Sequence, residues 1–225
     1  MRDIDLRQAL RESLTARCTP DSNTVVVEEL GIFSGAVRAD IAVINGSLKG
    51  YEIKSDRDTL ARLANQAVMY SKVFDTVTIV LADRHLERAA RLIPDWWGIE
   101  VAVTDGSPKL QLSRIRNESL NSEVDPFALV QLLWRDEALA LLGEASSSER
   151  LTSRPRRFLW QALATAVPLP ELKSIVRACL KNRKCWRVDL QQTQCDEKFR
   201  PYAMSSGSPC PRSRSHSHRY THRPN

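Results

Sequence analysis

Three charged side chains lie on two short segments whose sequence pattern predicts neighbouring β-strands. Apolar and polar residues alternate over 37–44 and again over 51–54, which is the period of a strand. Asp40 belongs to the first segment, and Glu52 and Lys54 belong to the second. Two carboxylates beside an amine are a combination that can hold a divalent cation and orient a water molecule for hydrolysis.

The register of the predicted hairpin decides whether these carboxylates meet. A two-residue Asn-Gly turn would mix polar and apolar residues on both faces of the hairpin. A three-residue connection, 45–47, instead pairs Ile44 with Leu48 and places Asp40 opposite Glu52. Because a slip of one residue moves every side chain to the other face, the apolar pattern selects this second register. We therefore predict a three-residue loop or an equivalent bulge.

Two carboxylates that face each other across a ladder lie only ~5 Å apart at their Cβ atoms and repel. A Mg²⁺ ion would relieve this repulsion, because it takes one or two protein carboxylates and keeps several waters or substrate oxygens. Lys54 points to the same face as Glu52 and could hold the attacking water. The alternative is a solvated strand face in which Glu52 and Lys54 form an ordinary salt pair.

Asp40, an eleven-residue gap and then Glu52-Ile53-Lys54 resemble the signature of the PD-(D/E)XK, or restriction-endonuclease-like, nuclease superfamily. A wider set of residues is similar to a group of small bacterial proteins predicted to be endonucleases, which includes a DNA-repair-associated branch. The resemblance spans about residues 5 to 105, and its further positions are Glu28, Glu29, Gly31, Arg38, Gly50, Asp56, Gln66 and Tyr70. One position departs from the signature, because Ala39 stands where proline is usual.

The resemblance implies a role for each matching residue. Asp40 and Glu52 would be metal ligands with the carbonyl of Ile53 as a third, and Lys54 would serve the water. Glu29 would be the upstream acid, although the alternation over 25–29 leaves the choice between Glu28 and Glu29 open. The implied cofactor is Mg²⁺ or Mn²⁺.

A helix predicted from about Asp56 to Val73 carries three further candidates. Arg62, Gln66 and Tyr70 are spaced four apart and therefore share one face. Gln66 matches a position where the superfamily places a polar residue near the metal. We assign Arg62 and Tyr70, together with Arg38, to nucleic-acid contacts.

Composition limits the class of protein. The chain has 225 residues, 42% of them hydrophobic, and a formal net charge of +6, which suits a polyanionic partner such as DNA. Five scattered cysteines without a Cys-x-x-Cys pair predict a reducing compartment and neither a disulfide framework nor a zinc site. No apolar run approaches ~18 residues, and the charged amino terminus is unlike a secretory signal. We therefore expect a cytoplasmic protein with no membrane partner.

The pattern along the chain predicts an α/β fold: a restriction-endonuclease-like central mixed sheet flanked by helices, with a C-terminal helical appendage and a disordered tail. Residues 1–120 would form the nuclease-like domain, 125–190 the helical region and 191–225 the basic tail, with a serine-rich linker at 145–154. The predicted helices are 5–17, 56–73, 83–93, 127–142, 156–166 and 170–183, and the strands beyond the hairpin are 24–30, 74–82, 99–103 and 109–116.

These observations favour a metal-dependent nuclease that hydrolyses DNA phosphodiester bonds, and we expect it to act in DNA repair or defence. Two alternatives stay open. The first is a non-catalytic nucleic-acid-binding module on the same fold. The second is a protein-interaction subunit, or a homodimer, that uses the C-terminal helices.

Overall fold

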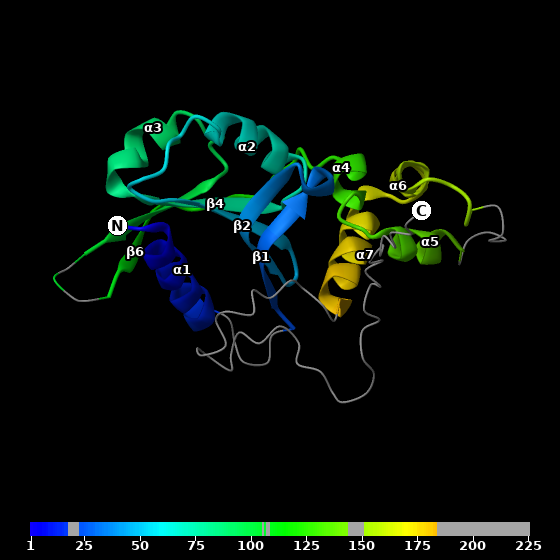
Figure 1. The fold of residues 1–225 in the computed structure, drawn as a ribbon, viewed down its shortest axis with the longest axis horizontal. Helices are drawn as coiled ribbons and strands as arrows, with labels where there is room; N and C mark the ends of the chain where they lie inside the picture. The colour runs from blue at the N-terminus through cyan, green and yellow to red at the C-terminus, as the bar shows by residue number, and fades with distance from the viewer. Residues whose placement is uncertain (18–22, 105, 107–108, 144–150, 184–225) are drawn as a thin grey trace, which may run out of the picture.

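The computed structural model describes residues 1–17, 23–104, 106, 109–143 and 151–183. Its centre is a six-stranded mixed sheet in which the spatial order follows the chain order (Figure 1). β3, β4 and β5 are parallel, and the remaining pairings are antiparallel. The strands are β1 (Val25–Ile32), β2 (Val37–Ile44), β3 (Leu48–Lys54), β4 (Thr76–Ala82), β5 (Gly98–Val103) and β6 (Gln111–Arg116). The predicted mixed α/β fold with a C-terminal helical region is confirmed.

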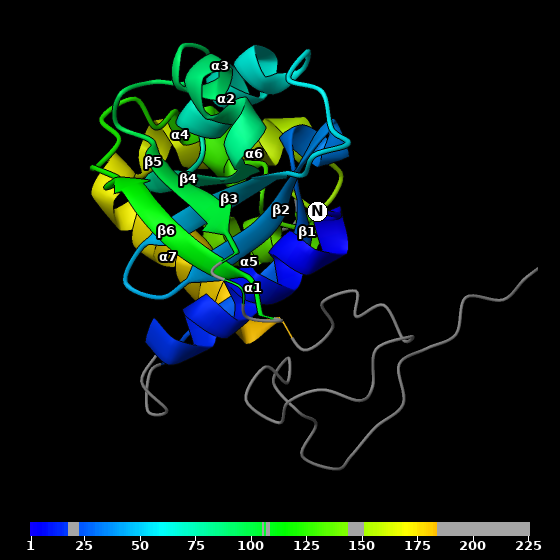
Figure 2. The same cartoon turned by 90° about the vertical axis from the view of Figure 1, so that its left-hand side faces the viewer.

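Helices cover both faces of the sheet (Figures 1 and 2). The first helix, α1, lies on one face, where its apolar stripe packs against residues of β2 and β3. The other face is covered by α2, α3 and the C-terminal helices. The helices are α1 (Asp3–Arg17), α2 (Leu63–Ser71), α3 (Leu86–Ala90), α4 (Pro126–Val130), α5 (Arg135–Gly143), α6 (Arg156–Ala166) and α7 (Leu169–Asn182).

The hairpin of β2 and β3 has the register that the apolar pattern selects. Ile44 pairs with Leu48 and Ile41 with Tyr51, and a three-residue loop joins the two strands. The Asn45 side chain closes this loop, because its Oδ1 accepts a hydrogen bond from the backbone N–H of Ser47 at 3.0 Å. This is the asparagine turn chemistry expected at such a position.

The segment after β3 differs from the prediction, because α2 begins at Leu63 and not near Asp56. The Asp58 carboxylate accepts hydrogen bonds from both the backbone N–H and the hydroxyl of Ser55, at 2.7 and 2.6 Å. The Ser-x-x-Asp pattern, which reads as a helix start, here closes a separate turn that delays the helix.

The predicted helix over 127–142 is divided into α4 and α5. Asp125 caps α4 by accepting a hydrogen bond from the N–H of Ala128 at 2.6 Å. Glu137 accepts a hydrogen bond from the N–H of Trp134 at 2.7 Å, which begins a second helix. Arg183 stabilises the break, since its guanidinium donates to both the carbonyl of Leu132 and the Glu137 carboxylate.

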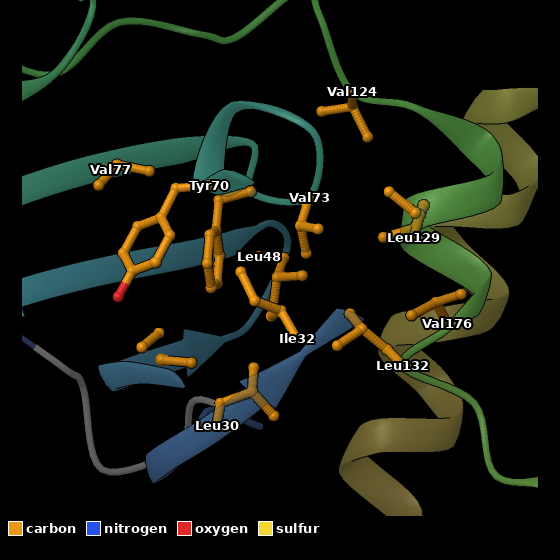
Figure 3. Packing of buried hydrophobic residues seen from close by; sticks show 14 of the residues in the cluster. Leu30, Ile32, Leu48, Tyr70, Val73, Val77, Val124, Leu129, Leu132 and Val176 are labelled. Carbon is orange, nitrogen blue, oxygen red and sulfur yellow. The ribbon is translucent and has the colours of Figure 1, made fainter. Parts of the chain in front are cut away.

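One hydrophobic core joins the sheet to the C-terminal helices. Side chains of β1, β3 and α2 belong to the same buried cluster as side chains of α4 and α7 (Figure 3). Ile32 of β1 and Val176 of α7 are both fully buried members of it. The helical region predicted as a separate appendage therefore shares its core with the sheet.

Asp75 fastens α7 to the hairpin by polar contacts. Its Oδ1 lies 2.8 Å from Lys173 Nζ, and its Oδ2 lies 3.8 Å from Arg177. Asp75 Oδ2 also accepts a hydrogen bond from the backbone N–H of Leu48 at 2.8 Å. The carboxylate is 10% exposed, so one nearly buried group links α7 with the first residue of β3.

Two further predictions concern other parts of the chain. The tail over 191–225, and most of the linker over 145–154, lie outside the described residues. Within the described part of the chain, no helix combines the length and apolar character that crossing a membrane requires.

Candidate active site

Asp40 lies where the ladder between β2 and β3 ends. The last paired residues are Ile41 and Tyr51, so Asp40 and Glu52 follow at the point where the two strands separate. Asp40 Oδ2 accepts a hydrogen bond from the backbone N–H of Ile53 at 2.7 Å. The carboxylate thus takes the place of a strand carbonyl as the acceptor for this N–H. Its side chain is 22% exposed.

Glu52 is the centre of a hydrogen-bond network beside Asp40. One of its oxygens, Oε1, lies 2.6 Å from Lys54 Nζ and accepts a bond from Gln66 Nε2 at 2.7 Å. Lys54 also donates to Gln66 Oε1 at 3.2 Å, which closes a triangle of three side chains. The other oxygen, Oε2, accepts from the hydroxyl of Tyr70. Asp40, Glu52, Lys54 and Gln66 thus come together as predicted, with Glu52 only 2% exposed.

Arg7 of α1 is a member of the site that the sequence reasoning missed. Its guanidinium donates to the carbonyl of Asp40 at 3.1 Å and to Asp40 Oδ1 at 3.3 Å. The same group lies 3.3 Å from Glu29 Oε1 and 4.0 Å from Glu28 Oε2. The spacing of α1 predicted only an apolar stripe, so nothing in the sequence near Asp40 pointed to an arginine from a helix 33 residues earlier.

Two glutamates of β1 stay candidates for the upstream acid that the resemblance implies. Glu29, the residue favoured by the sequence, contacts Arg7, whereas Glu28 contacts Arg11. Glu29 adopts a φ of 52°, a left-handed conformation that few residues other than glycine favour. This local turn of the backbone explains why alternation along β1 could not decide the question.

The residues assigned to nucleic-acid contacts differ in their exposure to solvent. Arg38 and Arg62 are exposed, as a DNA contact requires. Tyr70 is 0% exposed, so its assignment as a nucleic-acid contact is wrong. Its hydroxyl lies within hydrogen-bond distance of Glu52 and of the carbonyl of Arg38, and its ring packs against Phe74 and Trp97. Burial and the neighbouring Glu52 raise the pKa of Tyr70 well above its usual value, so the hydroxyl keeps its proton and acts as a donor.

The electrostatics of the site follow from two carboxylates in a half-buried space. Burial and the nearby Glu52 carboxylate raise the pKa of Asp40 from 3.8 to about 7. The N–H of Ile53 and the cations of Arg7 and Lys54 oppose this shift without cancelling it. Asp40 therefore binds a proton more readily than an ordinary aspartate, and a cation bound between the two acids would relieve the same repulsion.

The oxygen donors of the site fit the cation that the resemblance implies. Asp40 and Glu52 offer carboxylate oxygens and Ile53 a carbonyl, and hard oxygen donors of this kind suit Mg²⁺. Among the described residues, no group of three or more His, Cys, Asp or Glu side chains is placed to hold a metal ion. In the structure, Arg7 and Lys54 supply the positive charge that the two acids need.

The fold and this site define a class of mixed α/β proteins that hold an aspartate, a glutamate and a lysine at the end of a central hairpin. The chain belongs to the bacteriophage P4 protein cII family, whose model matches residues 2–204. It is 26% identical over 162 residues to Protein cII of Enterobacteria phage P4, across 72% of this chain and 60% of that protein. The chain therefore spans less than two thirds of that relative's length.

Among solved structures, the chain is similar to a protein of unknown function from Silicibacter pomeroyi. The two are 20% identical, and the match covers 66% of this chain and 94% of the other, with a TM-score of 0.41.

Proposed function

We propose that this protein is a divalent-metal-dependent nuclease that hydrolyses phosphodiester bonds of DNA. The observation that supports the proposal best is the meeting of Asp40, Glu52 and Lys54 at the end of one hairpin, with Gln66 bonded to two of the three. An isolated salt bridge needs one carboxylate and one amine, whereas this site has a second carboxylate beside them. It is the set of groups that phosphodiester hydrolysis uses.

Each residue of the site would have a distinct task. Asp40, Glu52 and the carbonyl of Ile53 would hold Mg²⁺ or Mn²⁺, which when bound would polarise the phosphate and lower the pKa of a bound water. Lys54 would hold the attacking water and stabilise charge that develops on the phosphate. Gln66 fixes Lys54 and Glu52 relative to each other, and is therefore a positioning residue.

A cleavage assay with a matched pair of lysine variants tests the proposal. The full chain should cut single-stranded, duplex or branched DNA in the presence of Mg²⁺ or Mn²⁺. Lys54→Ala should lower the rate by at least about 100-fold, the usual cost of losing a group that stabilises charge in the transition state. Lys49→Ala is the control, because Lys49 lies on the same strand outside the site. Equal rates for the two variants, or an inert wild-type protein with both metals, would count decisively against nuclease activity.

A second candidate function is a nucleic-acid-binding module without catalysis. One observation favours it: Arg7 already neutralises Asp40, and protein donors occupy both oxygens of Glu52. A permanent arginine would then replace the metal. Mn²⁺ separates the two functions, because a binding site occupied at 100 times its dissociation constant stabilises the fold by about 2.7 kcal/mol. The nuclease should show this gain in thermal stability, and Asp40→Asn should abolish it, whereas the binding module should show no gain.

A further inference from the structure

Charge is distributed very unevenly along the chain. Residues 1–150 contain 18 lysines and arginines and 23 aspartates and glutamates, a net charge of −5. Residues 151–183, which include α6 and α7, contain seven basic residues and one acidic residue, a net charge of +6. The part that carries the candidate active site is therefore acidic as a whole and would repel a polyanion at long range. Within the described part of the chain, the excess of basic residues lies in the helical region.

Part of this basic charge is already used inside the protein. Lys173 and Arg177 bind Asp75, and Arg183 binds Glu137. The remaining arginines gather at the start of α6 and in the turn before it.

The beginning of α6 and the residues just before it present three arginines to solvent. Arg154, Arg156 and Arg157 are all exposed. Among the residues that the structure describes, no carboxylate forms a salt bridge with any of the three. Arg154 and Arg156 instead stack on aromatic rings, 4.9 Å from the centroid of Phe158 and 4.5 Å from that of Trp160. Their guanidinium groups are thus held in place, and no carboxylate of the described residues pairs with their charge.

Two exposed aromatic rings accompany these arginines. Phe158 is 44% exposed and Trp134 is 52% exposed. The segment before α5 lies beside α6, because Trp160 Nε1 donates to the carbonyl of Leu133 at 3.1 Å and Arg135 donates to the carbonyl of Thr152. We name this surface the arginine–aromatic face, and it consists of Trp134, Arg135, Arg154, Arg156, Arg157 and Phe158.

We propose that the arginine–aromatic face binds single-stranded DNA. Arginine binds phosphate with two parallel hydrogen bonds, and exposed aromatic rings stack on unpaired bases of any sequence. Arg154 stacks on the exposed ring of Phe158, so a phosphate-binding charge and a base-stacking surface occur together there. The guanidinium group over Trp134 belongs to Arg183, which is buried and bound to Glu137, so Trp134 adds a ring and no free charge. Paired bases of a duplex could not stack on these rings, whereas unpaired bases could. The inference rests on the proposed function for the class of ligand, namely nucleic acid.

Fluorescence anisotropy with a labelled single-stranded oligonucleotide and a duplex of the same length tests the inference. The full chain with Lys54→Ala is used, so that cleavage does not interfere. Arg154→Gln with Arg157→Gln should weaken single-strand binding at least about tenfold and reduce the dependence of affinity on salt by about one to two released ions. Arg88→Gln with Arg91→Gln is the control, because it removes the same charge from exposed positions near α3.

The ring contribution is tested separately at Phe158. Phe158→Leu should weaken single-strand binding about five- to a hundredfold, because it keeps apolar volume but removes the stacking surface. Phe158→Tyr should restore binding, and neither change should alter duplex binding by more than about twofold. Circular dichroism melting shows whether each variant is folded.

The outcomes are separable from those of the cleavage assay. Preference for the duplex, equal binding by the arginine pair and its control, or no DNA binding at low salt would each overturn the inference, and the last would favour an acidic protein partner. Single-strand binding that depends on this face, together with no cleavage by the wild-type chain, would keep the inference and refute the nuclease.

Discussion

Glu52 and Glu100 are both buried carboxylates in the same sheet, on β3 and β5, and their surroundings differ. Glu52 lies among a lysine, a glutamine and a tyrosine, with the second carboxylate of Asp40 nearby. Glu100 is 0% exposed and is held by two arginines, with Arg17 Nη1 and Arg114 Nε at 2.9 and 3.0 Å. Its second oxygen, Oε2, has no hydrogen-bond partner within the described part of the structure.

Glu52 belongs to the candidate active site, whereas Glu100 belongs to a structural cluster of ion pairs. Glu100 joins α1 to the edge strand β6, and the charges around it are balanced by arginines that are partly exposed. Burial and the neighbouring carboxylates of Glu118 and Glu100 raise the pKa of the adjacent Tyr51 to about 12, so its hydroxyl keeps its proton near neutral pH. Burial of a carboxylate alone therefore does not indicate chemistry, whereas a second acid and an amine beside it do.

The largest expected effect is on cleavage. Glu52→Gln should lower the rate of DNA hydrolysis at least about 100-fold, because the amide removes the negative charge that Lys54 and the metal would need. Glu100→Gln, a change of the same chemistry in the other cluster, should leave the rate within about twofold. Steady-state cleavage by the two variants measures the difference. Similar losses in both would show that the rate reports stability and not chemistry.

A smaller effect is expected on stability. Glu100→Gln should lower the free energy of unfolding by about 1–3 kcal/mol, because Arg17 and Arg114 lose a charged acceptor that binds them both. Both arginines are partly exposed and can turn to water, which limits the loss. Urea denaturation of the variant and the wild-type chain gives the value. An unchanged midpoint would mean that the desolvation cost of Glu100 cancels its ion pairs.

A third effect concerns pH and depends on Asp40 alone. The folded protein holds a proton on Asp40 up to about pH 7, whereas an ordinary aspartate releases it near 3.8. Between these values the unfolded chain binds fewer protons than the folded one, so the contribution of Asp40 to the free energy of unfolding decreases as pH rises and becomes constant above about pH 7. Urea denaturation across this window, with Asp40→Asn as the reference, isolates the slope. A difference between wild type and variant that does not change with pH would contradict the raised pKa.

Much of the hairpin could be predicted because a strand has only two faces. Apolar alternation determined the pairing of Ile44 with Leu48 and hence the positions of Asp40 and Glu52. The same argument failed at Glu29, where a left-handed backbone interrupts the alternation. A period of two assumes a regular strand, and no residue type in β1 marks the exception.

Other parts of the site depend on tertiary packing that a local pattern does not contain. Arg7 reaches Asp40 only because α1 crosses the end of the hairpin, and that crossing is set by the core. Tyr70 shares a helical face with Gln66, yet the packing of Trp97 and Phe74 makes that position internal. Helical spacing correctly grouped the two residues but could not tell which of them faces solvent.

The contact of α7 with Asp75 has a practical consequence for anyone who wishes to study the sheet alone. A truncation that ends the chain just before α7 would remove Lys173 and Arg177. Asp75, beside the first residue of β3, would then lack both cations. It would also uncover the apolar side chains that Val176 and Leu172 protect. Activity measured on such a shortened protein would report the damage to its hairpin. Substitutions in the full chain are therefore the better way to separate hydrolysis from DNA binding.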